Sequence, residues 1–184
     1  MRAKTPSFIA EQELAVSRAH SKVLEKRFRA ATALYNDVLA EALSRLRQLR
    51  QDPDFAIAKA MPKSKAKSET FRQLRTRHGF TEASLQKFSE HIQNTSWIRD
   101  HMRGHATQTT AKRAFLAVER YAFAPKGSRV GRPRFKRGGQ LSSVEGKEDS
   151  CLVIRDNVFK WSGLTVPVIP ERGPWWDQAH ACPT

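Results

Sequence analysis

The chain has 184 residues, 39% of them hydrophobic, which is enough to build the core of one compact domain or of two small ones. The 33 Lys and Arg against 18 Asp and Glu give a net charge of +15, which favours a polyanion partner, because basic side chains on phosphates release condensed counterions. No apolar run approaches the roughly 18 residues of a membrane span and no secretory leader is present, so we expect a cytoplasmic, nucleoid-associated protein that contacts no membrane.

The positive charge is concentrated in the first three quarters of the chain. Residues 1–139 carry 29 Lys or Arg against 12 Asp or Glu, whereas residues 140–184 carry 4 against 6. Within the first part, residues 101–139 hold ten basic side chains and a single acid, Glu119. We therefore expect nucleic acid to bind there; the alternative is a basic surface that is only solvated.

The first long element is a predicted helix that begins near Ala10 and ends before Asp52. Apolar residues spaced by threes and fours mark its buried face: Leu24, Phe28, Ala31, Tyr35, Val38, Ala42, Leu46 and Leu49. Pro53 disfavours the helical conformation in the residue before it, which predicts the end of the helix. The basic residues of the last turns suit the negative end of the helix dipole and need no ligand: Arg45, Arg47 and Arg50.

Two short helices are predicted after a linking segment. We expect residues 51–67 to be exposed and mobile, apart from a turn of helix at residues 55–60, because they contain Pro53, Pro62 and the three lysines at positions 63, 65 and 67. Ser68 can cap a helix that stops at Gly79. Thr81 can cap the next helix, which continues to about residue 93.

The last helix runs from Thr107 to about Phe123. Its apolar stripe consists of Thr107, Ala111, Phe115, Val118 and Ala122. The other face carries Lys112, Arg113 and Arg120, which we expect to contact nucleic acid. With this helix, the predicted helical lobe of about four helices spans residues 10–124.

Beyond residue 140 the hydrophobic period changes from helical to alternating. Three strands are predicted at residues 151–155, 158–161 and 164–169, joined by the two-residue turns Asp156-Asn157 and Ser162-Gly163. These turns pair Arg155 with Val158, Ile154 with Phe159, Leu152 with Trp161, Trp161 with Leu164 and Phe159 with Val166. One face is then apolar (Leu152, Ile154, Phe159, Trp161, Leu164, Val166) and the other carries Arg155, Lys160 and Thr165. Pro167 cannot donate to a ladder, so the third strand should be an edge there or leave that amide position unpaired.

The predicted fold class is therefore α+β. A helical lobe is inserted in, or followed by, a small antiparallel β-barrel or meander at residues 140–169, and residues 170–184 form a tail without a pattern.

A basic, glycine-rich connector at residues 125–139 joins the helices to the strands. We expect its cations to reach phosphates: Lys126, Arg129, Arg132, Arg134, Lys136 and Arg137. Phe135 either stacks on a base or is a core residue that starts a strand. The tripeptide at residues 131–133, Gly-Arg-Pro, matches part of a minor-groove AT-hook, but Val130 stands where that motif has Arg.

No set of residues in the sequence predicts catalysis, a metal site or a cofactor. His101 and His105 have the spacing of two ligands on one helix face, but no HExxH glutamate accompanies them. Asp37 and Glu41 lie one helical turn apart among basic residues and are simplest as ion-pair partners. Glu145, Glu148 and Asp149 are predicted to be a solvated cluster in a loop. We therefore expect a binding protein, not an enzyme.

Three separated stretches add a resemblance to a known family. They are LYNDVLAEAL in the first helix, KRAFLAVERYAF in the last helix and GRPRFKRGGQLSSVEGK before the strands. In kind and in order they are similar to the N-terminal half of TnpB-type transposon-encoded RNA-guided nucleases, which are related to type V CRISPR effectors. The resemblance runs from about Leu34 to Ile169.

The resemblance implies a wedge-like β-barrel built from strands near both ends of the chain, the first within residues 1–9, with a helical recognition lobe inserted between them. The implied ligand is a guide RNA and its heteroduplex with target DNA. Carried over to this sequence, it implies that Arg132, Arg134, Lys136 and Arg137 face nucleic-acid backbone. It implies packing roles for Tyr35, Phe115 and Tyr121.

The sequence departs from the family in one respect. In the family, a RuvC-like nuclease domain with three acidic metal ligands and a zinc ribbon with paired CxxC motifs follow this segment, and neither is found here. We therefore expect a nucleic-acid-binding N-terminal fragment without cleavage activity, with RNA, DNA and a missing C-terminal nuclease half as candidate partners. One alternative is a stand-alone DNA-binding regulator, with helices 68–78 and 82–93 as a helix-turn-helix and residues 126–139 as a minor-groove arm. The other is a non-functional transposon remnant.

Overall fold

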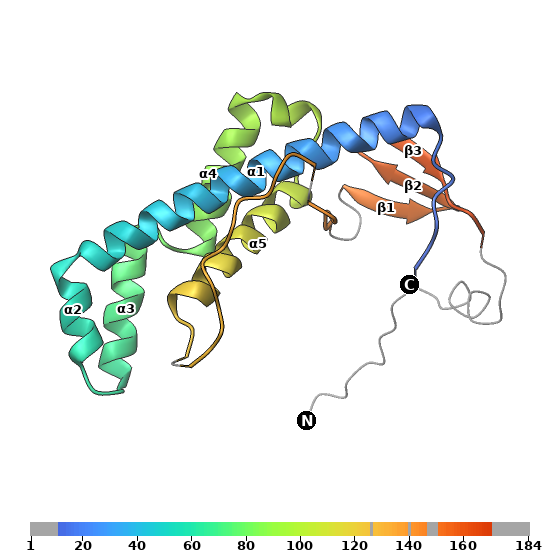
Figure 1. Ribbon diagram of the computed structural model, residues 1–184. Helices are drawn as coiled ribbons and strands as arrows, with labels where there is room; N and C mark the ends of the chain where they lie inside the picture. The colour runs from blue at the N-terminus through green and yellow to red at the C-terminus, as the bar shows by residue number, and fades with distance from the viewer. Residues whose placement is uncertain (1–10, 126, 140, 147–150, 171–184) are drawn as a thin grey trace.

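The computed structural model describes residues 11–125, 127–139, 141–146 and 151–170, which have an α+β fold (Figure 1). The helices are α1 (Arg18–Gln51), α2 (Pro53–Ala60), α3 (Lys65–Arg77), α4 (Glu82–Thr95), the 3-10 helix η1 (Trp97–Asp100) and α5 (His105–Ala122). The strands are β1 (Leu152–Arg155), β2 (Val158–Trp161) and β3 (Leu164–Pro167). The strand expected within residues 1–9, Lys126 and residues 171–184 of the expected tail lie outside the described residues.

Helix α1 ends where the sequence predicts, but it begins at Arg18 instead of near Ala10. Ser17 caps it, because its hydroxyl accepts the backbone N–H of His20 at 3.2 Å. At the other end, Asp52 leaves the helical conformation with ψ at 128°. The predicted start was wrong because residues 13–15 are extended and pair with the strand β3, which the spacing of apolar residues in the sequence does not reveal.

The extended segment before α1 lies beside β3. Leu14 and Val168 form an antiparallel bridge, and the N–H of Ala15 donates to the carbonyl oxygen of Pro167 at 2.8 Å. Strand β3 therefore has neighbours on both sides here and is not a free edge. Pro167 has no N–H to donate, but its pairing with Ala15 needs only the carbonyl oxygen of Pro167, so proline is tolerated at this position.

In residues 51–67 the helix predicted at residues 55–60 is confirmed as α2, which starts two residues earlier, and most of the segment is exposed as predicted. The difference is that this segment also contains the start of α3. The carboxylate of Asp52 accepts the N–H of Asp54 at 2.9 Å and caps α2. Helix α3 is capped by Ser64 and not by Ser68, so it begins three residues before the first residue of the expected helix. Local capping residues made these helices possible, and packing of α2 against α3 makes them stable.

Helices α4 and α5 agree with the sequence. The hydroxyl of Thr81 accepts the N–H of Ser84 at 3.2 Å, as expected for the cap of α4. The preceding turn passes through Gly79, whose φ of +61° lies in the left-handed region that favours glycine. The ring of Phe80 then packs at 5.4 Å from that of Phe115 on α5.

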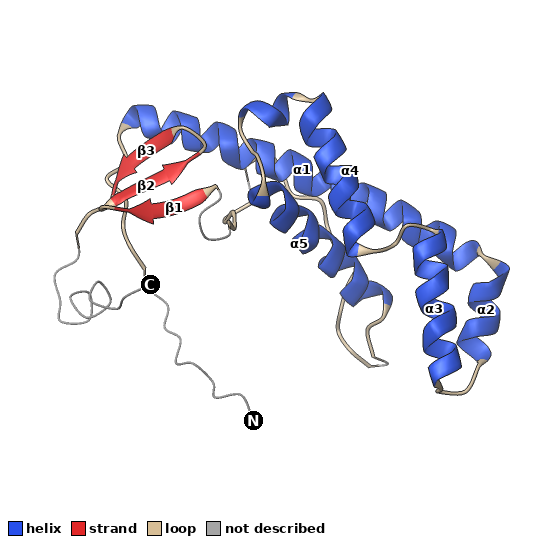
Figure 2. Ribbon diagram, turned by 180° about the vertical axis from the view of Figure 1, so that it is seen from behind, coloured by secondary structure: helices blue, strands red, loops and turns tan. Residues whose placement is uncertain are grey.

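Helix α1 runs the length of the molecule and carries most of the core. Leu34, Val38 and Leu39 are completely buried between α1, α4 and α5. The α2–α3 hairpin lies at the C-terminal end of α1, and the sheet lies at its N-terminal end (Figure 2). This arrangement leaves one side of α1 to be covered by the chain that follows α5.

The three strands form an antiparallel sheet in the order β1-β2-β3. The pairs are those that the turns predict, including Ile154 with Phe159 and Trp161 with Leu164. Both turns have positive φ at two successive residues: Asp156 (54°), Asn157 (57°), Ser162 (42°) and Gly163 (84°). This is the conformation of the two-residue hairpin turn that matches the twist of the strands.

The sheet differs from the expectation in closure and burial. The described strands form an open sheet and not a closed barrel. Trp161 and Val166 are buried against α1, but Ile154, on the same predicted apolar face, is 51% exposed. Helix α1 lies along β3, with the ring of Phe28 at 6.1 Å from that of Trp161, whereas Ile154 belongs to β1, at the other side of the sheet (Figure 1). Within the described residues, no helix combines the length and apolar character needed to cross a membrane.

Candidate nucleic-acid interface

The connector after α5 lies along α1, whose side chains hold its backbone (Figure 1). The amide nitrogen of Asn36 donates to the carbonyl oxygen of Lys136 at 2.7 Å, and the amide oxygen of Asn36 accepts the N–H of Lys136 at 2.8 Å. The hydroxyl of Thr32 accepts the N–H of Leu141 at 3.3 Å, and Leu141 is buried. The connector therefore has a defined path, although it belongs to no helix or strand.

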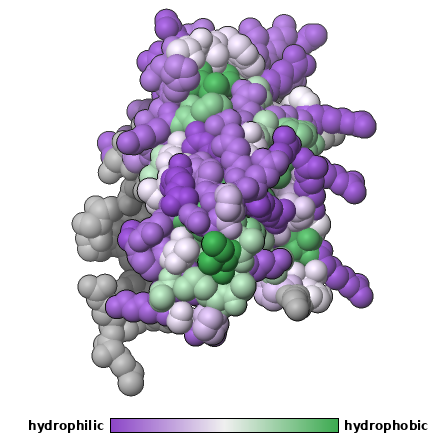
Figure 3. Space-filling model, turned by 90° about the vertical axis from the view of Figure 1, so that its left-hand side faces the viewer, coloured by the Kyte–Doolittle hydropathy of each residue, from purple (hydrophilic) through white to green (hydrophobic). Residues whose placement is uncertain are grey.

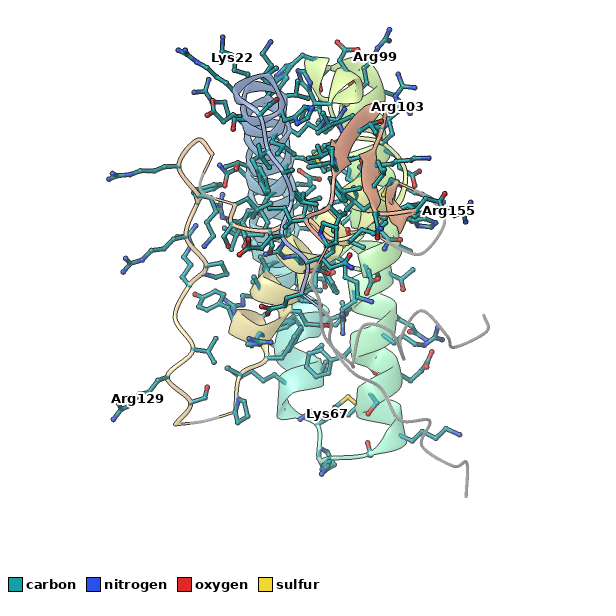
Figure 4. The ribbon with its side chains drawn as sticks, turned by 90° about the vertical axis from the view of Figure 1, so that its right-hand side faces the viewer. Lys22, Lys67, Arg99, Arg103, Arg129 and Arg155 are labelled. Carbon is teal, nitrogen blue, oxygen red and sulfur yellow. The ribbon has the colours of Figure 1, made fainter. Side chains whose placement is uncertain are left out.

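The basic side chains of residues 127–139 lie on the surface. Those exposed to solvent are Arg129, Arg132, Arg134, Lys136 and Arg137. Arg129 points away from the helices, on the side of the molecule opposite Arg99 and Arg103 (Figure 4). Lys126, the remaining predicted cation of the connector, lies outside the described residues.

Phe135 is 56% exposed and belongs to no strand. Of the two alternatives that the sequence left open, the one in which Phe135 is a core residue that starts a strand is therefore wrong. An exposed aromatic ring between Arg134 and Lys136 has the composition of a stacking platform for an unpaired base. Stacking remains a prediction.

Helix α1 adds cations that the sequence analysis did not assign to the interface. Arg29, Asn36 and Arg47 are separated by 7 and 11 residues, close to whole numbers of helical turns, so they share the face that holds the connector. Arg50 lies one turn beyond Arg47. This periodic spacing relative to Asn36 was visible in the sequence, but nothing there indicated that the connector returns to this face.

Two pockets lie where the connector meets α1. The first has a volume of about 230 Å³ and is lined by Leu43, Leu46, Arg47, Arg50, Gln51, Tyr121 and Arg132. The second has a volume of about 510 Å³ and is lined by Ser21, Leu24, Glu25, Phe28, Arg29, Gly138, Gly139, Leu141 and Ser142. Both combine apolar side chains with arginine. Arg132 of the connector lines the first, and Gly138 and Gly139 line the second.

The three predicted cations of α5 differ in whether they have partners within the protein. Lys112 lies 3.3 Å from the carboxylate of Glu82 on α4. Arg113 donates to the carbonyl oxygen of Ser143 at 2.7 Å and so holds the loop before the sheet. Arg120 is exposed. Two of the three therefore have partners within the protein.

Several other arginines stabilise the fold. Arg27 is 5% exposed and donates to the carbonyl oxygens of Trp161 and Ser162, which joins α1 to the turn between β2 and β3. Burial lowers its pKa from the usual value. Arg75 pairs with Glu119, and its guanidinium lies within 5.5 to 5.8 Å of three phenylalanine ring centroids. Part of the positive charge is thus structural.

Arg45 is a second cation of this structural kind. It donates to the carboxylate of Glu41 at 2.7 Å and to the carbonyl oxygen of Gly79 at 2.8 Å, and so links α1 to the turn before α4. The ion pair predicted for Glu41 is confirmed. For Asp37, the described residues contain no ion pair, and partial burial raises the pKa of its carboxyl group.

The two histidines with the spacing of metal ligands have partners other than a metal ion. His105 bonds to Gln108 through Nδ1 at 3.1 Å, and the ring of His101 packs at 5.6 Å from that of Trp97. In the part of the chain that the structure describes, no three His, Cys, Asp or Glu side chains are grouped so as to hold a metal ion.

The surface is predominantly hydrophilic at the end formed by α2 and α3, with small separate hydrophobic areas (Figure 3).

Comparison of the chain with protein-family models, with curated proteins and with solved structures finds no match. The assignment of a function therefore depends on the interface itself.

Proposed function

We propose that the chain binds RNA and DNA through the connector surface, defined as residues 127–139 together with Arg29, Arg47 and Arg50 of α1. The observation that carries this proposal is a contrast among the arginines. Arg27, Arg45 and Arg75 are partly or fully buried and have carbonyl or carboxylate partners. On the connector surface, Arg132 and Arg47 are exposed and have no carboxylate partner among the described residues. Exposed cations along an extended backbone suit a strand of phosphates.

The resemblance to TnpB-type nucleases gives this proposal its specific ligands, a guide RNA and target DNA. The pairing of residues 13–15 with β3 brings a segment from before the helices into the sheet, which supports a wedge-like barrel as the complete form of this region. In this proposal the chain is the binding part of such a nuclease and does not cut nucleic acid. The nuclease half is a candidate partner.

A helix-turn-helix regulator is less well supported. In that motif the two helices pack against each other across a tight turn. Here α3 packs against α2, with the rings of Phe55 and Phe71 at 5.7 Å, whereas α4 packs against α1 and α5. The two helices on either side of Gly79 therefore belong to different packing units.

Salt-dependent binding tests the proposal. Fluorescence anisotropy would measure the affinity of labelled single-stranded RNA, single-stranded DNA and duplex DNA at several salt concentrations. The test variant replaces Arg132, Arg134 and Lys136 with Ala, and the matched control replaces Lys63, Lys65 and Lys160, which are exposed elsewhere. We expect the test variant to lower the slope of log K against log salt by up to about three and the control to lower it by less than about one. Equal slopes for the two variants would contradict the proposed surface, and Mg²⁺-dependent cleavage by the wild-type chain would contradict the absence of nuclease activity.

A further inference from the structure

The smaller pocket of the connector surface is lined by three arginines from two segments far apart in the sequence. Arg47 and Arg50 lie one turn apart near the end of α1, and Arg132 reaches the same pocket from the connector. Leu43 and Leu46 contribute apolar side chains that are 8% and 3% exposed. The pocket thus places three solvent-exposed guanidinium groups beside an apolar wall.

Among the described residues, no acid balances these arginines. The pocket lining contains no carboxylate. The nearest acids along α1 are engaged elsewhere, since Glu41 pairs with Arg45 at 2.7 Å and Asp52 lies 3.1 Å from Arg77. On α5, Glu119 pairs with Arg75. Three like charges around one pocket repel one another, so the arrangement is stabilised by a bound anion.

The protein also positions these side chains. The guanidinium of Arg50 lies over the ring of Tyr121, 5.5 Å from its centroid, which limits the rotamers it can adopt. Arg132 belongs to the connector whose path Asn36 fixes four residues later, at Lys136. Planar guanidinium groups bind phosphate oxygens through pairs of parallel hydrogen bonds, which gives arginine an advantage over lysine at such a site.

We propose that Arg47, Arg50 and Arg132 form a phosphate pocket that holds one phosphodiester of a nucleic-acid strand lying along the connector. This inference rests on the proposed function and deepens it by assigning a fixed point to the bound strand. The volume of about 230 Å³ corresponds to roughly eight water molecules in the liquid, which accommodates a phosphate and part of its sugar. It is smaller than the roughly 300 to 1,000 Å³ of pockets that take whole cofactors or drug-sized ligands.

A double-mutant cycle distinguishes a shared phosphate from a diffuse positive field. The variants are Arg47→Ala, Arg132→Ala and their combination, measured by anisotropy with a labelled single-stranded RNA at one salt concentration. Each single change should weaken binding about tenfold, because it removes a charge-assisted contact to the same phosphate. The combination should weaken binding by less than a third of the product of the two single effects, since neither arginine can hold the phosphate well alone.

Arg134→Ala provides the matched control, because Arg134 lies on the same connector but does not line the pocket. Arg47→Ala combined with Arg134→Ala should weaken binding by the product of the single effects, within a factor of about two. If Arg47 and Arg132 also combine as a simple product, no phosphate is shared and the pocket proposal is overturned. Arg132→Lys keeps the charge but not the paired hydrogen bonds, so it should remain at least about threefold weaker than wild type.

A second measurement separates this inference from the proposed function. Inorganic phosphate is titrated against the wild-type chain, and the melting temperature is followed in a chloride buffer of matched ionic strength. A rise that Arg132→Ala abolishes and Arg134→Ala retains supports the pocket, even if no nucleic acid binds and the proposed function fails. If wild type binds neither phosphate nor RNA, both proposals are overturned. If wild type binds RNA but not inorganic phosphate, the proposed function stands, and the pocket is kept or overturned by the double-mutant cycle of Arg47 and Arg132.

Discussion

The side-chain amide of Asn36 forms two hydrogen bonds with the backbone of Lys136, one hundred residues later in the chain. This pair aligns the basic connector with the longest helix and brings Arg132 to the pocket that contains Arg47 and Arg50. A neutral side chain thereby decides where several cations lie.

Asn36→Ala should therefore weaken nucleic-acid binding without removing any charge. Loss of the two hydrogen bonds releases the connector, so we expect an affinity about three- to tenfold lower, with a salt slope close to that of wild type. Anisotropy at several salt concentrations measures both quantities. Asn94→Ala, an exposed change on α4, should leave the affinity unchanged. A large fall in slope for Asn36→Ala would contradict this expectation, because it would show that the released connector no longer places its cations on phosphates.

Arg27 and Arg29 are two residues apart on α1 but should behave in opposite ways. Arg27→Ala leaves the carbonyl oxygens of Trp161 and Ser162 without their donor and removes a cation that lies 5.0 Å from the Trp161 ring centroid. We expect a loss of about 2 to 4 kcal/mol in the free energy of unfolding, measured by urea denaturation. Arg29→Ala, an exposed change, should cost less than about 0.5 kcal/mol. Similar losses for both variants would argue against a structural role specific to Arg27.

Gly79 closes α3 in a turn that requires glycine for two reasons. Its φ is +61°, and an added Cβ would lie 3.0 Å from Nη1 of Arg45. The N–H of Phe80 donates to the carbonyl oxygen of Arg75 at 2.8 Å, which is the bond pattern of a glycine-terminated helix. Gly79→Ala should lower the free energy of unfolding by about 1 to 2 kcal/mol. Gly163 also has a positive φ, +84°, but an added Cβ there would meet no atom within 4 Å. Gly163→Ala therefore measures the effect of φ alone and should lower the free energy of unfolding by less than Gly79→Ala.

Asp52 should make the stability of the α2–α3 hairpin depend on pH. Hydrogen bonds from His78, from the N–H of Asp54 and from Arg77 lower the pKa of its carboxyl group below the usual value. A lowered folded-state pKa means that the ionised form stabilises the fold above the unfolded pKa of about 3.9, and that this contribution is lost as the pH falls through the folded pKa. Asp52→Asn should therefore be less stable than wild type at pH 7.

The difference between wild type and Asp52→Asn should shrink as the pH is lowered below about 4, in thermal melts across a pH series. Asp100→Asn is the control, because Asp100 is exposed and its only ion pair among the described residues is with Arg99 at 3.8 Å. A difference that stays constant from pH 7 to pH 3 would show that Asp52 acts through shape and not through charge.

Features that depend on neighbours in the chain were predictable from the sequence. The end of α1 follows from the geometry of Pro53. The cap of α4 follows from the hydroxyl of Thr81 next to free N–H groups. The register of the sheet follows from its two-residue turns. Each is decided within a few residues. The sequence likewise identified the connector as a basic segment, because its composition excludes both a core and a helix.

Features that depend on distant partners were not predictable. Residues 13–15 fit a helical pattern until β3 is placed beside them, and Phe135 could have been core until its surroundings were known. The α2–α3 hairpin needed the packing of Phe55 on Phe71 to be recognised as ordered. In each case the competing conformations are close in local free energy, and tertiary contacts determine which one forms.

The roles of the cations show the same division most clearly. The sequence by itself determined that the chain is strongly basic and that residues 125–139 carry much of that charge. Only the tertiary structure decided which arginines serve the fold and which lie on the connector surface, because a guanidinium group is equally able to cap a carbonyl, pair with a carboxylate or bind a phosphate. Arg27 and Arg29 have the same chemistry, and burial against Trp161 makes one of them structural while exposure leaves the other open to a ligand.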